Sequence, residues 1–559
     1  MTSPVPRVVL FLCVATLAAW VCFGASRGFF SGDSGVKMAQ AHALWQSSFS
    51  ARSLPHDYDL DPDGRYHPYD RFARKVGAAR QGIYSTWFAG AAAPLFGLLG
   101  IWGAPILPFV GAVLVACGLY CIFARLRVRP LASAGGIAAT VLATPLILHA
   151  SQFTEHSLAA GLVTWALALV VVGAKRPRQG QTEPEAQVRP FHAGALVALA
   201  ATLRPEGYCA VLSLGLAVAF MPSEGASALA SVRMRSARSA KYLLGATLVL
   251  GAYWATNLLS SGTWDPLVTA NHGRSATMRY SIVMLVGELG RPRVLTWLLP
   301  LLVPVVVSLF PPAWRRGRTF VAVHAMLAVG LAFLAWRAQS LSTARVLTGM
   351  FSVTPLAAYG LLGGPWRPGL RSLWLFSVSF LAQVLILDNG GDGGGLQLGA
   401  RLLFLALPPL VALATAVLDD DLTTARRAGP LTILAVVLLV GIGARGTWIG
   451  VRQAEVIADG GRAASEKVLS LDAGVVMTVR WWESQVLAPV LLGGKQLYSV
   501  YGDPRPFLER LAARGVRSLV VIGHRPLSVE LSGGKIAQTE SVSPGWLGVQ
   551  LVRIGDVVP

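Results

Sequence analysis

An aspartate lies just beyond the first apolar run of the chain, in the segment Ser31-Gly-Asp33. A carboxylate at a membrane surface can act as a general base towards the hydroxyl of an acceptor. Glu155 ends a second short polar segment, between two later apolar runs, and is a candidate for the same role. Either carboxylate could instead cap the helix that follows it, so the residue types alone leave both interpretations open.

Two opposite charges, Arg204 and Glu206, interrupt an apolar stretch on either side of Pro205. Charges at membrane depth are expensive unless they pair or serve a function, so we expect either an internal ion pair or a contact with a substrate. Arginines at the ends of other apolar runs have a fork geometry that suits phosphate oxygens, although arginines also commonly extend to the membrane surface. The candidates of this kind are Arg337, Arg345 and Arg401.

The long polar stretch after the first apolar run contains a pattern typical of a calcium loop. Four aspartates have the required spacing: Asp59, Asp61, Asp63 and Asp70. Such loops place carboxylates at alternate positions, with a glycine at the sixth and an acidic residue at the twelfth. Pro62 interrupts the pattern, and no helices with apolar periodicity flank it, so an aspartate-rich surface turn is the alternative. The cofactor is otherwise unknown, and a divalent cation at these carboxylates is the candidate.

The elements that position these residues belong to a membrane protein. Only 14% of the 559 residues are charged and 54% are hydrophobic, against about 25% charged in an ordinary soluble domain. Apolar runs of about 20 residues, the length that crosses a bilayer, recur along the chain. This composition excludes a soluble enzyme, a secreted disulfide scaffold and a disordered protein. The net charge of +20 comes from arginines in short loops, which is typical of the positive-inside rule rather than of a nucleic-acid partner.

We predict a polytopic α-helical membrane protein of about 13 spans. The expected spans cover residues 8–23, 104–123, 131–149, 155–173, 191–203, 207–221, 242–259, 294–310, 319–336, 346–363, 372–388, 400–418 and 429–449. The apolar region 83–123 could hold one span or two. If only its second half crosses, the basic loops 125–129, 175–189, 233–241, 315–318, 367–371 and 426–427 all share one side, which makes that side cytoplasmic.

This topology has three consequences for the organisation of the chain. Residues 1–449 form a transmembrane catalytic domain with a cytoplasmic N-terminus, and residues 26–83 form its first extracytoplasmic loop. The two short arms around Arg204 make a hairpin whose tip lies within the membrane, where irregular backbone must face a cavity or protein. Residues 450–559 form a small extracytoplasmic α/β domain, because Gly474–Val479 and Ser518–Ile522 have the pattern of buried strands and Pro506–Arg514 that of a helix.

Several of these segments together give the chain a recognisable order. The chain resembles the GT-C superfamily of membrane glycosyltransferases, the class that includes protein O-mannosyltransferases and aminoarabinose transferases. The segments that carry the resemblance are Ser31-Gly-Asp33, Gly82-Ile-Tyr-Ser-Thr-Trp87, Gln152-Phe-Thr-Glu155, Leu203-Arg-Pro-Glu-Gly207 and Gly399-Ala-Arg401. The chain departs from the family at Trp87-Phe-Ala89, where Tyr-Pro-Pro is common, and a basic residue near that point could only be Arg80.

The resemblance implies an enzyme that transfers a sugar from a polyprenyl-phosphate-linked donor to a lipid, glycan or protein acceptor on the outer face of the bacterial plasma membrane. Asp33 would be the base, with Glu155 as the next candidate. Arg80, Tyr84, Arg204, Glu206 and Arg401 would contact substrates, with Arg337 or Arg345 helping to neutralise the lipid phosphate. The alternatives are a polymerase or ligase of lipid-linked glycans, a lipid or sugar transporter, and a non-catalytic scaffold. Transporters often repeat broken helices in both halves, and the segment 345–418 shows no counterpart of the 191–221 hairpin.

Overall fold

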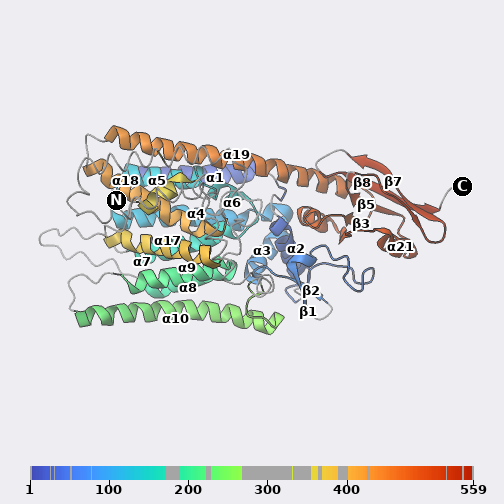
Figure 1. The fold of residues 1–559 in the computed structure, drawn as a ribbon, viewed down its shortest axis with the longest axis horizontal. Helices are drawn as coiled ribbons and strands as arrows, with labels where there is room; N and C mark the ends of the chain where they lie inside the picture. The colour runs from blue at the N-terminus through green and yellow to red at the C-terminus, as the bar shows by residue number, and fades with distance from the viewer. Residues whose placement is uncertain are drawn as a thin grey trace.

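The computed structural model describes residues 3–171, 189–221, 228–266, 354–362, 368–387, 401–424 and 429–556, together with the isolated residues 268 and 330. Within these ranges it leaves out residues 26, 30–31, 51–52, 77–78, 524 and 544–546. The molecule is elongated: a helical bundle occupies one end and a sheet domain the other (Figure 1). The N-terminus lies at the end of the bundle far from the sheet, and the C-terminus lies beyond the sheet.

The bundle is built from long apolar helices. Its described helices are α1 (Val5–Ala19, continued by a π-helical turn Trp20–Gly24), α4 (Ile106–Leu126), α5 (Pro130–Leu142), α6 (Leu146–Ser151), α7 (His156–Val170), α8 (Pro190–Leu203), α9 (Glu206–Ala219), α10 (Ala228–Ser261), α16 (Pro355–Leu362), α17 (Pro368–Leu387), α18 (Leu407–Thr424) and α19 (Gly429–Ser470). Over the described residues, six helices are long and apolar enough to cross a membrane. The chain is therefore a multi-pass membrane protein, while the number of 13 spans stays a prediction.

Small residues let the helices of the bundle approach each other closely. A Cβ atom added at Gly194 of α8 would lie 2.1 Å from the Tyr242 carbonyl of α10, and one at Gly245 would lie 2.1 Å from the Phe191 carbonyl. Such reciprocal small-residue contacts replace the hydrophobic effect as a source of packing energy between helices in lipid. At the N-terminal end of the bundle, the Arg129 guanidinium binds Asp419 at 2.5 Å and joins α5 to α18.

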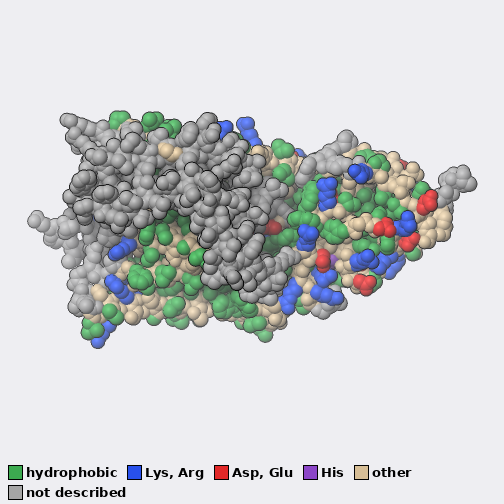
Figure 2. Space-filling model, in the orientation of Figure 1, with side chains coloured by type: hydrophobic (Ala, Val, Ile, Leu, Met, Phe, Trp, Pro, Cys, Tyr) green, Lys and Arg blue, Asp and Glu red, His purple; other side chains and the backbone are tan. Residues whose placement is uncertain are grey.

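The surface of the bundle has the charge distribution of a membrane protein. Among the residues coloured in Figure 2, lysine and arginine side chains lie near the end of the bundle far from the sheet and over the end of the molecule that holds the sheet domain. Between them, the described surface in this view is mainly hydrophobic. Two charged ends separated by an apolar band are expected where helices cross lipid, because charged side chains at the bilayer centre are costly.

The end of the bundle that faces the sheet domain is capped by the first long loop. This loop contains α2 (Gly32–Gln46) and a short antiparallel pair of strands, β1 (Ala73–Val76) and β2 (Ala79–Gly82). It leads into α3 (Thr86–Leu99), which starts where the Ser85 hydroxyl accepts a hydrogen bond from the Phe88 amide. Figure 1 places α3 beside α2 at this end of the bundle. Together with the 3₁₀ turn Gly100–Gly103, α3 is one of the six helices that are long and apolar enough to cross a membrane, so a single crossing by the region 83–123 stays a prediction.

The sheet domain has six strands in the order β4-β3-β5-β8-β7-β6. Its elements are β3 (Val475–Thr478), α20 (Glu483–Val486), a 3₁₀ helix (Ala488–Gly493), β4 (Gln496–Ser499), α21 (Arg505–Ala513), β5 (Ser518–Ile522), β6 (Ser528–Leu531), β7 (Lys535–Ser543) and β8 (Val549–Asp556). β3 pairs in parallel with β4 and β5, and the remaining pairs are antiparallel. The two predicted strands and the predicted helix are present, which confirms a small C-terminal α/β domain.

Two connections hold this domain against the bundle. Helix α19 continues unbroken from Gly429 to Ser470, so the expected boundary at residue 450 falls inside a helix that reaches the sheet (Figure 1). Helix α2 also packs closely on the domain, because a Cβ atom at Gly35 would lie 1.8 Å from the Gln485 carbonyl. Only glycine allows this approach, and it brings the domain within two residues of Asp33.

Candidate active site

Helix α2 carries the two charged residues at the centre of the site. Asp33 is in its first turn, where the positive end of the helix dipole favours a carboxylate. Lys37 follows four residues later, so both side chains project from the same face of the helix. Asp33 is only partly buried, whereas Lys37 is 1% exposed. The carboxylate is therefore the accessible member of the pair, and the ammonium lies beneath it.

Tyr84 links Asp33 to the segment that precedes α3. The Tyr84 hydroxyl donates a hydrogen bond of 2.6 Å to Oδ1 of Asp33. The Lys37 ammonium lies 4.6 Å from the centre of the Tyr84 ring, an arrangement that favours the cation. The Gln40 side chain donates to the backbone carbonyls of Gly82 and Tyr84. These contacts from α2 fix where the tyrosine lies.

A chain of buried ion pairs extends from Lys37 into the bundle. Nζ of Lys37 lies 2.6 Å from Oε2 of Glu155, at the start of α7. The other oxygen of Glu155 accepts a hydrogen bond of 2.9 Å from Nη1 of Arg204. Arg204 also binds Glu206 through both Nε and Nη2, at 2.9 and 2.5 Å. Each of these four residues is at most 8% exposed, so the charges are satisfied by one another rather than by water.

Among the residues that the structure describes, carboxylates outnumber cations in the site. Asp33 is near enough to Arg204 to interact with it electrostatically. Together with Glu155 and Glu206 it makes three carboxylates, which face the two cations Lys37 and Arg204. Among these carboxylates Asp33 is the least buried, and it accepts a hydrogen bond from the Tyr84 hydroxyl. This arrangement suits a group that accepts a proton from an approaching hydroxyl.

Aromatic packing holds the Glu155 segment in place. Phe153 is 1% exposed and contacts the rings of Phe29, Phe88 and Phe96, with ring centres 4.8–6.4 Å apart. These rings come from the first loop and from α3. Glu155 is thus fixed from three directions, by Phe153 two residues before it and by Lys37 and Arg204 at its carboxylate.

The structure brings together five of the residues singled out from the sequence: Asp33, Tyr84, Glu155, Arg204 and Glu206. Sequence reasoning missed Lys37. Its signal was its position one turn after Asp33 between the apolar residues Val36 and Met38, because a lysine flanked in this way is either exposed on a surface helix or buried with a partner. The partner is Glu155, which only the fold reveals.

The remaining predicted arginines lie apart from this cluster or outside the described residues. Arg80 is in β2 and binds Asp70 at 3.0 Å, so it does not join the ion chain. Arg337 and Arg345 lie outside the described residues. Arg401 opens a 3₁₀ helix (Arg401–Ala406) that precedes α18, and its side chain is outside the described part. Phe404 of this helix packs on His149, with ring centres 4.6 Å apart, so the backbone at Arg401 adjoins the polar segment that ends at Glu155.

The aspartate-rich segment contacts the C-terminal domain. Asp61 is fully buried and accepts hydrogen bonds from His56 at 3.0 Å and from the amides of Arg65 and Tyr66. Arg510 of α21 lies 3.5 Å from Asp61 and 4.0 Å from Asp63. The Tyr66 carbonyl accepts from the Ser499 amide at the edge of β4.

The four aspartates of the expected calcium loop do not converge. The Asp59 backbone carbonyl contacts Arg514, Asp70 binds Arg80, and the Asp63 side chain is 79% exposed. Across the described part of the chain, no group of three or more His, Cys, Asp or Glu side chains could hold a metal ion. The carboxylates that the sequence pattern assigned to a cation bind arginines, a histidine and backbone amides instead.

Comparison with known proteins rests on structure. No protein-family model matches the chain, and no curated protein matches it in sequence. ArnT from Cupriavidus metallidurans bound to undecaprenyl phosphate matches with a TM-score of 0.53 and 12% identity, over 98% of each chain. The archaeal oligosaccharyltransferase AglB from Archaeoglobus fulgidus, in complex with an inhibitory peptide and a dolichol-phosphate, matches with a TM-score of 0.48 and 11% identity, over 92% of this chain and 69% of that one.

The similarity to ArnT covers both the helical bundle and the C-terminal domain, since it extends over 98% of this chain. This is the fold that the order of the sequence segments indicated, with an acidic residue after the first apolar helix and a small α/β domain at the end of the chain. The chain therefore shares the fold of ArnT, in agreement with the resemblance to the GT-C superfamily seen in the sequence.

Proposed function

We propose that this protein transfers a sugar from a polyprenyl-phosphate-linked donor to an acceptor hydroxyl on the outer face of the plasma membrane, with Asp33 as the general base. The observation that carries the proposal is the setting of Asp33. Its carboxylate is partly exposed and held by the Tyr84 hydroxyl, directly above a buried chain of ion pairs. The fold shared with ArnT, which was solved with undecaprenyl phosphate, supports a lipid-phosphate donor.

The reaction follows from the hydrogen bonds of Asp33. Tyr84 donates to Oδ1 and orients the partly exposed carboxylate, which takes up the proton of the acceptor hydroxyl. The hydroxyl oxygen forms a bond to the anomeric carbon as the bond from that carbon to the phosphate oxygen breaks. The electron pair leaves with the polyprenyl phosphate, and attack from the opposite face inverts the configuration. A base in this position contributes about 10²–10⁴-fold to the rate.

We assign the buried ion chain a positioning role. Lys37 and Arg204 already form ion pairs with Glu155 and Glu206. Either cation would have to give up such a pair in order to bind a phosphate. Together they hold α2, and with it Asp33, against α7 and the hairpin of α8 and α9. Neutralising the leaving phosphate is then the role of arginines such as Arg401, Arg337 or Arg345, whose fork suits phosphate oxygens.

Release of the lipid phosphate tests the proposal directly. The purified chain in nanodiscs is incubated with undecaprenyl-phosphate carrying hexoses, pentoses or aminosugars, in the presence of extracted cell-envelope glycolipids and glycans. We expect the wild-type chain to release undecaprenyl phosphate from at least one donor and the Asp33→Asn variant to release it at least about 100-fold more slowly. Equal release by the two proteins, or release from no donor, would overturn the proposal.

A further inference from the structure

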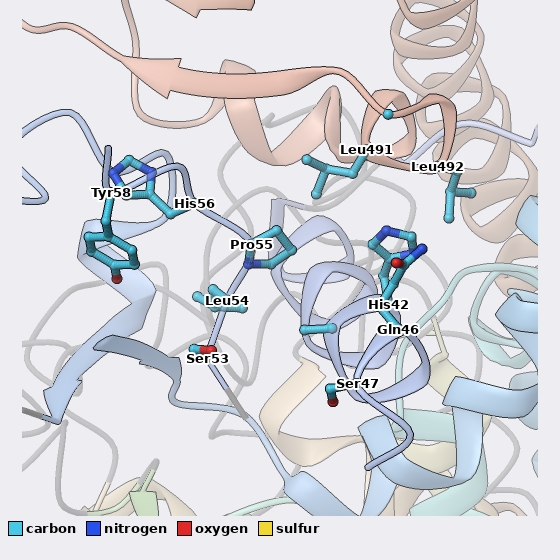
Figure 3. Close-up of a pocket in the computed structure, with 12 residues that line it drawn as sticks. His42, Gln46, Ser47, Ser53, Leu54, Pro55, His56, Tyr58, Leu491 and Leu492 are labelled. Atoms are coloured by element: carbon cyan, nitrogen blue, oxygen red, sulfur yellow. The ribbon is translucent and has the colours of Figure 1, made fainter. Parts of the chain in front are cut away.

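A pocket lies between the first loop and the C-terminal domain, apart from the ion pairs of Lys37, Glu155, Arg204 and Glu206. Its volume is about 620 Å³, within the range of about 300–1,000 Å³ that is usual for small-molecule sites. Three parts of the chain form its walls: the last turns of α2, the loop around residues 53–58, and the segment around residues 491–494 that precedes β4. Figure 3 shows His42 and Gln46 projecting from α2 on one side, with Leu491 and Leu492 of the C-terminal domain above them.

The walls of this pocket are polar without being charged. Hydrogen-bonding groups come from His42, Gln46, Ser47, Ser53, His56 and Tyr58, and apolar contacts come from Leu54, Pro55, Leu491 and Leu492. Among the lining residues that the structure describes, none is Lys, Arg, Asp or Glu. Such a surface lacks the cations that a phosphate or carboxylate ligand needs, and it alternates hydrogen-bonding groups with apolar faces. The ligand it suits is neutral and rich in hydroxyl groups.

His56 anchors one wall of the pocket through a buried contact with Asp61. Its Nε2 lies 3.0 Å from Oδ2 of the buried Asp61, and a carboxylate only accepts, so Nε2 carries the hydrogen. In the neutral ring Nδ1 is then an acceptor. The His56 side chain is 0% exposed, and Nδ1 has no hydrogen-bond partner among the described residues. The ring is therefore enclosed, the backbone of His56 is the part that borders the pocket, and the ring holds this wall in place through Asp61.

We propose that this pocket binds a neutral saccharide unit of the acceptor, so that the acceptor of the proposed transfer reaction is a glycan. The inference rests on the proposed function, because it identifies the substrate class of that reaction. The pocket lies on the same helix as the base: nine residues separate His42 from Asp33, which corresponds to about 14 Å along α2. The saccharide held here is therefore a unit remote from the hydroxyl that reacts.

Direct binding tests this inference without turnover. The full chain in nanodiscs is titrated with neutral trisaccharides of glucose, mannose, galactose and N-acetylglucosamine, and binding is followed by saturation-transfer NMR. Sulfated trisaccharides and neutral tripeptides serve as comparison probes. We expect a neutral trisaccharide to bind, and the His42→Ala and Gln46→Ala variants each to weaken that binding at least 10-fold. Gln538→Ala, which removes an exposed glutamine of β7 far from the pocket, should bind as the wild type does.

Three results would overturn the inference: no neutral trisaccharide binds, only the sulfated or peptide probes bind, or both pocket variants bind as tightly as Gln538→Ala. Asp33→Asn separates this inference from the proposed function, since it should still bind the trisaccharide although it no longer turns over the donor. Donor turnover without saccharide binding rejects the pocket and leaves the proposed function standing. Saccharide binding without release of lipid phosphate from any donor rejects the proposed transfer reaction, and with it the assignment of the saccharide as its acceptor.

Discussion

Lys37 and Glu155 form a salt bridge of 2.6 Å between side chains that are 1% and 3% exposed. The bond joins α2, which belongs to the first loop, to the start of α7 in the bundle. Removing one partner of a buried ion pair typically costs about 3–5 kcal/mol, because the other charge is left without compensation. The position of Asp33 therefore depends on a pair of charges that water does not reach.

The first prediction concerns this pair. Lys37→Met should destabilise the protein, because Glu155 keeps only Arg204 as a counter-ion. The double change Lys37→Met with Glu155→Gln should recover part of the loss, since no buried charge is then left unpaired. The unfolding temperature in detergent measures both effects. Lys467→Met, which removes an exposed lysine of α19, is the control, and a Lys37→Met variant as stable as this control would contradict the assigned role.

The second prediction concerns Asp33. Asp33→Asn keeps the shape of the side chain and the hydrogen bond from Tyr84, but it cannot take up the proton. Donor turnover should fall by at least about 10²-fold while expression and the unfolding temperature stay close to wild type. Asp63→Asn, a change to an exposed aspartate of the same loop, should be nearly as active as wild type. If Asp33→Asn fails to accumulate in the membrane, Asp33 is a helix cap; if it turns over normally, Glu155 is the next candidate.

The third prediction separates structure from chemistry at the hairpin tip. Arg204→Met alone leaves Glu206 without a cation, and Glu206→Leu alone leaves Arg204 with a single carboxylate, so each should lower the unfolding temperature. In the double variant Glu155 still has Lys37, and stability should largely return. Activity that returns with stability assigns Arg204 to positioning. A double variant that folds normally but remains inactive would instead place Arg204 in contact with a substrate.

The fourth prediction is a pH dependence of the first loop. Burial, together with the nearby charges of His56 and Arg80, lowers the pKa of His67 to about 3. Between about pH 6.5, the ordinary histidine pKa, and pH 3, His67 is protonated in the unfolded chain but neutral in the folded loop. Stability should therefore be complete above about pH 6.5 and fall on acidification, by at most about 1.4 kcal/mol per pH unit. The unfolding temperature measured from pH 7.5 to pH 4.5 should show this slope.

His67→Asn is the matched variant for this effect. In the wild type the Tyr69 amide donates a hydrogen bond to Nδ1 of His67, and the asparagine side chain can accept the same bond. Asparagine does not titrate, so the unfolding temperature of the variant should change less steeply between pH 6.5 and 4.5. Asp61 does not confuse the comparison. Burial alone would raise its pKa, but the hydrogen bonds from His56 and the loop amides outweigh burial and hold the pKa below its ordinary value. The stability contributed by Asp61 is therefore lost only below about pH 4. Identical slopes for both proteins would contradict the histidine assignment.

The fifth prediction fixes the orientation of the molecule. In a Cys22→Ser background, which removes the exposed native cysteine, a cysteine at Glu530 on β6 should react with a membrane-impermeant thiol reagent in intact spheroplasts. A cysteine at Ser236, on the exposed first part of α10, should react only after lysis. The reverse pattern would place Asp33 and the C-terminal domain in the cytoplasm and exclude transfer on the outer face.

Local patterns in the sequence predicted the elements that local forces determine. Buried runs of β-branched residues predicted β3 and β5, and Pro205 between two charges predicted the break between α8 and α9. The cluster was predicted in part, because Asp33, Glu155 and Arg204 each follow a recognisable break in an apolar run. Lys37 was missed because its buried setting comes from Tyr84 and Glu155, which are remote in sequence. The aspartate-rich pattern predicted a calcium site, but Asp61 instead contacts Arg510 of the C-terminal domain. A pattern within the first loop could not predict this contact, because Arg510 is remote in sequence.

The contact between the first loop and the C-terminal domain has a consequence for how the protein is made. Asp61 and Arg510 are separated by 449 residues, and the close approach of Gly35 to Gln485 spans a similar length of chain. At about 5–20 residues per second, the ribosome needs roughly 20–90 s to synthesise the second partner after the first. During that time α2 can bind Glu155 but not the sheet domain. Asp33 should therefore reach its final setting only at the end of synthesis, so a prematurely terminated chain would be membrane-inserted but without a completed active site.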